Sequence, residues 1–293
     1  MRTEPFDIAM IGHFAKDRIV YGGTSRVASG GAVYYGSVPL ARLGYKVAVI
    51  TKLREEDFPL LGELKEEGIT VFAHAAGETA GMENIYFTKD RDKRVCKPLG
   101  FAGAFEEDEI SDVEAKTFLV VPIQAGEVDL SLLRKLSKKA RIALDAQGFV
   151  RFAEGERVVF KDWPEKEEGL SLVDILKVDD TEAEVLTGVG DPREAASILA
   201  SYGPREIVLT RRDGVLVYVE GQFYEAPFRP REIHGRTGRG DTCFATYVAK
   251  RLSTDAEQAS RYAAAVTSLK MEVPGPFNGT VKNVEALLEG AGW

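Results

Sequence analysis

Short apolar segments alternate along the chain with amphipathic helical segments, and this alternation predicts the fold. A helical pattern over about 32–43 separates the first two apolar segments, 8–11 and 47–50. Further helical patterns, such as 130–139 and 193–202, separate the later apolar segments 118–121, 142–144, 174–178 and 207–210. Strands spaced by helices are typical of a mostly parallel sheet. We therefore expect an α/β protein whose mostly parallel sheet is covered by helices on both faces.

Three stretches depart from this alternation. Segments 215–219 and 222–226 flank Glu220-Gly221, which predicts an antiparallel hairpin at the sheet edge. The β-prone runs 17–21 and 25–28 surround Gly22-Gly23, and the runs 84–88 and 94–97 flank the charged turn 89–93. Two interpretations stay open for these runs, a small separate sheet and ordinary surface hairpins. The chain has no internal repeat or low-complexity linker, so we expect one domain over 1–293, with β elements inserted at about 15–29 and 82–100.

Composition restricts the classes of partner. The chain has 293 residues, 44% of them hydrophobic, which is enough for a large core. Its net charge of −8 disfavours nucleic acid as a partner. The first residues lack a signal-peptide layout, and no apolar run approaches the length that spans a membrane, so we expect a cytoplasmic protein with no membrane partner. Cys96, Cys243 and the three histidines are scattered, which gives no support to a zinc site.

The glycine-rich stretch 235–245 carries the strongest chemical signal. Downstream of it an amphipathic helix is predicted by apolar side chains at positions i, i+3, i+4 and i+8, namely Phe244, Tyr247, Val248 and Leu252. Asp241 therefore lies in the first helical turn. The N–H groups of that turn and of residues 238–240 form a donor site suited to phosphate. A carboxylate beside an anion site favours phosphoryl transfer, whereas the alternative interpretation makes Asp241 a helix cap.

Four further polar or glycine-rich segments lie near predicted strand ends. They are 12–17, Gly30-Gly31, 179–182 and 210–214. Open α/β sheets bind ligands at the carboxyl ends of their strands. Asp145, Gln147 and Arg151 follow another predicted strand and are weaker candidates for the same cleft.

With these motifs in this order, the sequence resembles the ribokinase-like, or PfkB-type, carbohydrate kinase family along essentially its whole length. Family members carry a GG-containing signature, an N-x-x-E motif, a T-x-G-type nucleotide turn and a D-T-x-G-A-G-D signature. The corresponding residues here are Gly30-Gly31, Asp179 to Glu182, Thr210 to Gly214 and Gly235 to Asp241. The resemblance implies a Rossmann-like domain with a small β lid, which would account for the irregular segments.

The resemblance also implies a role for each of these residues. Asp241 corresponds to the base that takes the proton of the acceptor hydroxyl, and Gly238, Arg239 and Gly240 correspond to the anion hole. Substrate binding is assigned to Asp17, Gly30, Gly31 and Tyr35. The nucleotide side is assigned to Asp179, Glu182, Thr210, Arg212 and Gly214. Glu182 resembles the residue that helps to place Mg²⁺ through water. The rival interpretations are a solvated helix-face Glu182 and an exposed turn Asp17.

Several positions depart from the family pattern. Tyr35 replaces a polar Asn, so Tyr34 and Tyr35 either stack on a substrate ring or pack in the core. Gly235 replaces the first Asp of the signature, which many relatives use in a monovalent-cation site, so potassium activation is not assumed. Asp179 replaces the motif Asn. Arg239 replaces Ala, and it either pairs with a phosphate of ATP or an anionic substrate, or projects into solvent or toward a carboxylate.

From these residues we expect an ATP-dependent, Mg²⁺-requiring kinase that phosphorylates a hydroxyl of a sugar or of a polyol or cyclitol such as inositol. A nucleoside kinase of the same family is one alternative. A noncatalytic sugar- or nucleotide-binding protein that kept the fold is the other. Family lids often pair between subunits, so a homodimer is expected to form through 84–97.

Overall fold

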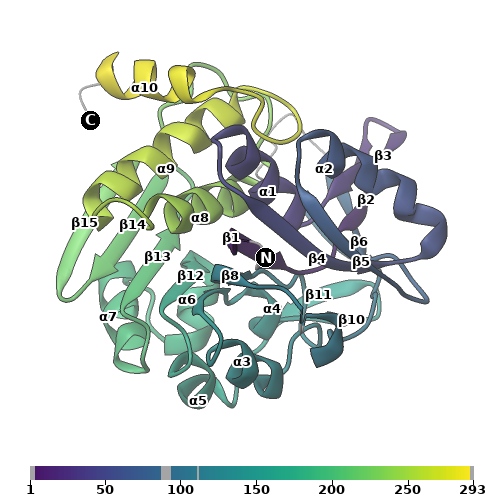
Figure 1. Ribbon diagram of the computed structural model, residues 1–293, viewed down its shortest axis with the longest axis horizontal. Helices are drawn as coiled ribbons and strands as arrows, with labels where there is room; N and C mark the ends of the chain where they lie inside the picture. The colour runs from purple at the N-terminus through teal and green to yellow at the C-terminus, as the bar shows by residue number, and fades with distance from the viewer. Residues whose placement is uncertain (1–3, 87–93, 111, 291–293) are drawn as a thin grey trace.

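The predicted alternation forms one large sheet in the computed structural model, which describes residues 4–86, 94–110 and 112–290. The strand order is β15-β14-β13-β12-β9-β8-β1-β4-β5 (Figure 1). Its strands are β1 (Phe6–Ile11), β4 (Val47–Leu53), β5 (Thr70–Ala75), β8 (Ala115–Val120), β9 (Arg141–Asp145), β12 (Ile175–Asp179), β13 (Glu206–Thr210), β14 (Gly214–Val219) and β15 (Gln222–Pro227). All neighbouring strands from β5 to β13 pair in parallel. The predicted edge hairpin is β14 with β15, and both of its pairings are antiparallel.

Helices cover both faces of this sheet, as the sequence predicted. One face carries α1 (Ala32–Arg42), α2 (Gly62–Glu66), α8 (Arg239–Lys250) and α9 (Ala256–Met271), and α10 (Val281–Gly290) packs outside α9. The other side carries α3 (Leu130–Leu136), α4 (Gln147–Val150), α5 (Lys166–Leu170), α6 (Asp180–Thr187) and α7 (Pro192–Ser201). Two short 3₁₀ helices, η1 (Glu55–Leu61) and η2 (Glu107–Glu109), lie in connections. Among the described residues no helix is both long enough and apolar enough to cross a membrane.

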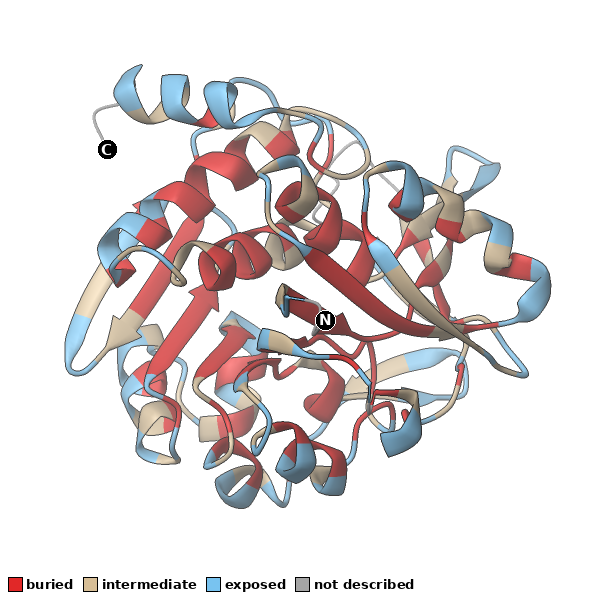
Figure 2. Cartoon of the chain, viewed as in Figure 1, coloured by how far each residue is buried: buried red, intermediate tan, exposed pale blue. Residues whose placement is uncertain are grey.

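The core consists of two apolar layers separated by the sheet. Alternate residues of β1 show the division, because Ile8 and Met10 pack into the α1–α8 layer while Ala9 and Ile11 pack into the opposite layer. All four side chains are fully buried, and buried positions fill the centre of the molecule in Figure 2. This burial on both faces explains why these strands appear in the sequence as continuous apolar runs.

The irregular segments form one small sheet beside the large one. Its strands are β2 (Ala15–Tyr21), β3 (Thr24–Gly30), β6 (Gly81–Tyr86) and β7 (Arg94–Gly100), in the order β3-β2-β6-β7. Strand β2 pairs with β6 in parallel, so the two predicted hairpins belong to a single sheet and the interpretation as separate surface hairpins is wrong. We call this sheet the lid. The predicted turn 89–93 and the end of the run 84–88 lie outside the described residues.

Two features of the architecture were missed from the sequence. Strand β5 has a mixed burial pattern because it lies at the sheet edge beyond β4. The second is a two-stranded antiparallel sheet formed by β10 (Arg151–Glu154) and β11 (Arg157–Phe160), which contacts lid strand β7. The helix predicted over 130–139 is shorter, since α3 ends at Leu136.

Candidate active site

The glycine-rich stretch forms a loop that leads directly into α8. Gly238 is the N-cap residue, with φ of 79°, and Asp241 lies in the first turn of the helix. The residue at the N-cap is therefore Gly238, which has no side chain to form a capping hydrogen bond. The interpretation of Asp241 as the cap of α8 is wrong. The N–H groups of residues 238–241 therefore surround the positive end of the helix dipole without a capping oxygen from the N-cap side chain. This loop, residues 235–240, is called the anion loop below.

Gly238 of the anion loop lies too close to Tyr35 to carry a side chain, whereas Gly240 lies within ordinary contact distance of Thr210. A Cβ on Gly238 would lie 2.1 Å from Cγ of Tyr35, and one on Gly240 would lie 3.5 Å from Oγ1 of Thr210. Thr242 also donates a hydrogen bond to the backbone carbonyl of Tyr35 at 3.0 Å. These contacts bring the end of β13 and the start of α1 together around Asp241.

Asp241 is buried among charged groups that act on its pKa. Burial and the nearby Asp145 carboxylate raise the pKa of Asp241 to about 6, against the opposing effects of Lys177, Lys270 and Arg151. A carboxylate with this pKa is ionised at neutral pH and accepts a proton more readily than an ordinary Asp. The arrangement therefore suits a general base.

Lys177 lies on β12 in the middle of a buried cluster. Its Nζ is 3.1 Å from Oδ1 of Asp145 and 3.3 Å from Oε2 of Glu182. Burial acts to lower the pKa of Lys177, but the two carboxylates outweigh it and raise the pKa, so the ammonium stays charged. A Cβ on Gly240 would lie 4.0 Å from this Nζ, so the ammonium lies next to the anion loop.

Asp179 and Glu182 form a capping box at the start of α6. The Asp179 side chain accepts from the N–H of Glu182, and the Glu182 side chain accepts from the N–H of Asp179, both at 2.8 Å. Glu182 is 1% exposed, so the interpretation as a solvated helix-face residue is wrong. Burial raises the pKa of Glu182 to about 8, with Lys177 opposing the rise.

Thr210, Arg212 and Gly214 lie at the turn between β13 and β14, which we call the donor turn (residues 210–214). Thr210 is buried at the end of β13, facing Gly240. The carbonyl of Arg212 accepts a hydrogen bond from Nη1 of Arg239 at 2.9 Å, so the Arg239 guanidinium joins the anion loop to the donor turn. Gly214 has a structural reason to be glycine, because a Cβ there would lie 2.7 Å from the carbonyl oxygen of Ala226 on β15.

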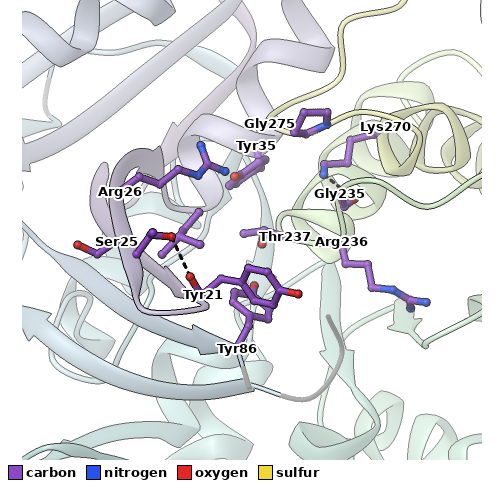
Figure 3. A pocket seen from close by; sticks show the side chains of 13 residues that line it. Tyr21, Ser25, Arg26, Tyr35, Tyr86, Gly235, Arg236, Thr237, Lys270 and Gly275 are labelled. Atoms are coloured by element: carbon purple, nitrogen blue, oxygen red, sulfur yellow. Dashed lines mark hydrogen bonds between the residues drawn. The ribbon is translucent and has the colours of Figure 1, made fainter. Parts of the chain in front are cut away.

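A cavity of about 670 Å³ opens between the lid and the anion loop. Figure 3 shows Tyr35 at one side of it, with Arg26 extending toward this tyrosine from the lid and Lys270 beside Gly235 opposite. Lid residues Ile19, Tyr21 and Tyr86 complete the enclosure. The lining combines aromatic rings with hydrogen-bonding groups, as expected of a pocket for a small polar ring. We call it the acceptor cavity.

The two tyrosines have different roles. Tyr35 lines the acceptor cavity, whereas the hydroxyl of Tyr34 donates to Glu63 at 2.6 Å and its ring packs on Phe14. Of the two interpretations left open for this pair, core packing therefore holds for Tyr34. Tyr35 stays a candidate substrate residue, and Tyr34 is a packing residue.

Asp17, Gly30 and Gly31 meet where the lid joins the large sheet. Asp17 is 8% exposed, so it is not an exposed turn residue, and its Oδ1 accepts from the N–H of Met82 at 2.8 Å. A Cβ on Gly30 would lie 2.5 Å from Oδ2 of Asp17. Gly31 has φ of 85° and precedes α1. Burial raises the pKa of Tyr35, and the negative charges of Asp17 and Asp241 raise it further, so both carboxylates lie within electrostatic reach of its hydroxyl.

The weaker candidates are Asp145, Gln147 and Arg151, which either hold neighbouring groups or line a second cavity. Asp145 binds Lys177, and Gln147 donates to the carbonyl of Ile123 at 3.0 Å. Arg151, Gln147, Asp179 and Glu182 line a cavity of about 510 Å³, and Nε of Arg151 is buried without a hydrogen-bond partner. In the described part of the chain, no group of three or more His, Cys, Asp or Glu side chains is placed to hold a metal ion.

The sequence analysis missed two cations of the site, Lys177 and Lys270. Lys177 had a readable signal, since it is a charged residue between the apolar residues Leu176 and Val178 of a predicted strand. Lys270 is fully buried near the end of α9. Its signal was weaker, because a Lys in the last turn of a helix is common.

Comparison with known proteins identifies the family. Residues 6–283 match the model of the pfkB family carbohydrate kinases. A cytidine kinase from Thermococcus kodakarensis is 33% identical over 250 residues, covering 80% of this chain and 84% of that protein. A pyrophosphate-dependent kinase of the ribokinase family, solved with a pyrophosphate analogue and myo-inositol, superposes with a TM-score of 0.88 and 38% identity, covering 95% of this chain and 99% of that one. The ribokinase of Arabidopsis thaliana shares the fold, with a TM-score of 0.78, 19% identity, and coverage of 98% and 100%.

The chain therefore belongs to the pfkB family of carbohydrate kinases, with the ribokinase fold and its β lid. The family resemblance predicted from the ordered motifs is confirmed, and so is the prediction that the protein is a kinase.

Proposed function

We propose that this kinase transfers a phosphoryl group from pyrophosphate to a ring hydroxyl of a cyclitol such as myo-inositol. The observation that carries the proposal is Arg239. Its guanidinium lies within the anion loop and against the donor turn, so it extends the anion site toward the donor side. A fixed cation there favours a compact, highly charged donor over the longer chain of a nucleotide. The 38% identical pyrophosphate-dependent kinase supports this choice.

The acceptor hydroxyl is placed by the cavity between Tyr35, the lid and the anion loop. In the proposed step its oxygen attacks one phosphorus of pyrophosphate while its proton passes to the carboxylate of Asp241. The bond from that phosphorus to the bridging oxygen breaks, and orthophosphate leaves. Alignment and charge neutralisation carry most of such a reaction.

The donor phosphates are balanced by cations that converge on the anion loop. The N–H groups of Gly238 and Gly240 are proposed to bind the transferred group, whereas the N–H of Arg239 donates to the carbonyl of Arg236 at 3.2 Å. Lys177 Nζ lies about 4 Å from the Gly240 Cβ position. Arg239 reaches the donor turn. Pyrophosphate carries no base or ribose, so these contacts have to supply the whole of its recognition.

Mg²⁺ is proposed to accompany the donor. The described residues offer no three-carboxylate cage, and Glu182 is occupied by Asp179 and Lys177, so the donor set fits an ion held mainly by phosphates and water. Asp179 and Glu182 line the adjacent cavity and are the residues that would orient such waters. When bound, the ion would neutralise donor charge.

A nucleoside kinase is the second candidate. The 33% identical cytidine kinase favours it, and Tyr35 and Tyr86 offer rings on which a base could stack. In this alternative ATP is the donor, as the sequence analysis expected.

A donor–acceptor matrix tests the proposal. Pyrophosphate and ATP are each combined with myo-inositol, ribose and cytidine at a fixed Mg²⁺ concentration, and initial rates give kcat/KM for each pair. We expect pyrophosphate with myo-inositol to exceed every ATP pair by about tenfold or more, roughly 1.4 kcal/mol of transition-state stabilisation. A preference for ATP with cytidine would establish the alternative. Thermal stabilisation by ligands without turnover of any pair would support a noncatalytic binding protein.

A further inference from the structure

Lys270 carries a buried positive charge beside the anion loop. It lies near the end of α9 and is 0% exposed, and its Nζ donates to the carbonyl of Gly235 at 2.9 Å. The ammonium also lies 5.4 Å from the centre of the Tyr35 ring. Among the described residues, no carboxylate lies within 4.0 Å of this Nζ. One carbonyl and one aromatic face replace only part of the hydration that an ammonium loses when it is buried.

The backbone around Lys270 fixes the start of the anion loop. The N–H groups of His234 and Gly235 donate to the carbonyl of Met271 at 2.9 and 3.0 Å. A Cβ on Gly235 would lie 2.2 Å from the carbonyl oxygen of Val273, so the loop lies directly against the turn that follows α9. The ammonium thus holds the first carbonyl of the loop whose last residues precede Asp241.

The charged surroundings of Lys270 point toward the reacting groups. Asp241 and Arg239 face it from α8, Tyr35 faces it from α1, and Arg26 and Arg236 share the acceptor cavity with it. Burial lowers the pKa of Lys270 to about 8, with Asp241 opposing the fall and Arg239 adding to it. The lysine is therefore charged at neutral pH but loses its proton within an accessible range.

We propose that Lys270 is a positioning residue, a built-in cation that holds the anion loop through the Gly235 carbonyl and keeps the Asp241 carboxylate ionised for proton transfer. The protein then keeps a buried charge that is unfavourable for stability, because phosphoryl transfer needs a positive charge next to the anion loop. The inference rests on phosphoryl transfer at Asp241, but on neither the donor nor the acceptor proposed above.

Three variants, and a rescue experiment on a fourth, Lys270→Ala, test this role with whichever donor and acceptor turn over. Lys270→Met removes the charge but keeps most of the volume, and Lys270→Arg keeps a charge that does not titrate. Lys250→Met is the control, because that lysine also stacks on an aromatic ring, Tyr262 at 4.3 Å, but lies at the far end of α8. Activity of the wild-type protein should fall as the pH rises through about 8, where Lys270 deprotonates.

We expect Lys270→Met to lower kcat roughly tenfold to a hundredfold while its melting temperature stays equal or rises, since a poorly compensated buried charge is gone. The Lys270→Arg variant should lose the fall in activity near pH 8. Ammonium chloride should partly restore Lys270→Ala, relative to sodium chloride at equal ionic strength.

The inference is overturned by a Lys270→Met enzyme whose kcat stays within twofold of wild type. It is equally overturned if Lys270→Met loses activity only in proportion to lost folded protein and ammonium fails to restore Lys270→Ala. A wild-type protein inactive with every donor and acceptor would instead contradict the proposed function.

Discussion

Arg239 is the side chain that most clearly separates this site from the family signature. It occupies a position where relatives carry Ala, and its Nη1 contacts the carbonyl of Arg212 across the cleft. The sequence alone left four environments open for this guanidinium, namely a phosphate of ATP, an anionic substrate, solvent and a carboxylate. A backbone carbonyl was not among them, because a contact 27 positions away depends on how β13 and α8 are brought together.

The Arg239→Ala variant should lower kcat/KM for the phosphoryl donor by about tenfold to a hundredfold, because a charge-assisted contact near the phosphates is lost. The acceptor KM should change little. Steady-state kinetics with varied donor measure this, and Arg239→Lys, which keeps charge without the planar fork, should recover part of the loss. Unchanged donor kinetics in Arg239→Ala would remove Arg239 from the donor site.

Other residues show how far sequence could reach. Asp241 was predicted in the first turn of a helix that follows a glycine-rich turn, and the structure has it there, because the signals of a helix start are local. Glu182 was expected near the end of a strand and lies there, but its burial against Lys177 was not predicted. Tyr34 and Tyr35 are adjacent, yet one faces Glu63 and the other the cavity. Such side-chain directions depend on tertiary packing rather than on the order of residues.

The junction of β1 with lid strand β2 contains a buried acid–imidazole pair. Nε2 of His13 lies 2.9 Å from the carbonyl of Gly103, which can only accept, so this nitrogen carries the proton. Nδ1 then presents a lone pair to Oε2 of Glu127 at 3.4 Å. Burial raises the pKa of Glu127 to about 8, against the backbone N–H groups of Gln124, Ile123 and His13. A protonated Glu127 matches the lone pair on His13.

Because the folded-state pKa of Glu127 is raised, its contribution to stability is present below about 4.5 and is lost as the pH rises toward about 8. Glu127→Gln presents an amide N–H in place of the acid proton and should remove this dependence. We expect the fall in unfolding free energy between pH 5 and pH 8 to be smaller in Glu127→Gln than in wild type, by on the order of 3 kcal/mol.

Chemical denaturation at pH 5, 6.5 and 8 measures this difference. The control is Glu184→Gln, an exposed glutamate on α6 that should follow the wild-type profile. Parallel profiles for wild type and Glu127→Gln would contradict the prediction, because they would show that Glu127 is ionised in the folded protein throughout pH 5 to pH 8.

The architecture as a whole was largely readable from the sequence. Buried parallel strands and the helices between them have strong periodic patterns, so the large sheet and its two covered faces were predicted correctly. The edge strand β5 and the β10–β11 sheet were missed, because short, half-exposed strands have weak patterns. The family resemblance predicted a lid, but the parallel pairing of β2 with β6 joins segments more than 60 residues apart and has no local signal.

In the proposed function the acceptor binds in the acceptor cavity between the lid and the anion loop, and the donor binds near Arg239 and the donor turn. The central claim is that Asp241 directs a phosphoryl group of pyrophosphate onto a cyclitol hydroxyl. A noncatalytic protein and an ATP-dependent kinase would share much of this geometry, so the products decide between them.

The most direct measurement is a ³¹P NMR time course of pyrophosphate, Mg²⁺ and myo-inositol with the wild-type protein and with Asp241→Asn. The wild-type protein should form one phosphomonoester and one orthophosphate for each pyrophosphate consumed. Asp241→Asn should form neither at a detectable rate, a loss of about a thousandfold or more, while pyrophosphate still raises its melting temperature. Retained turnover in Asp241→Asn, or a phosphomonoester that forms from ATP but not from pyrophosphate, would contradict the account.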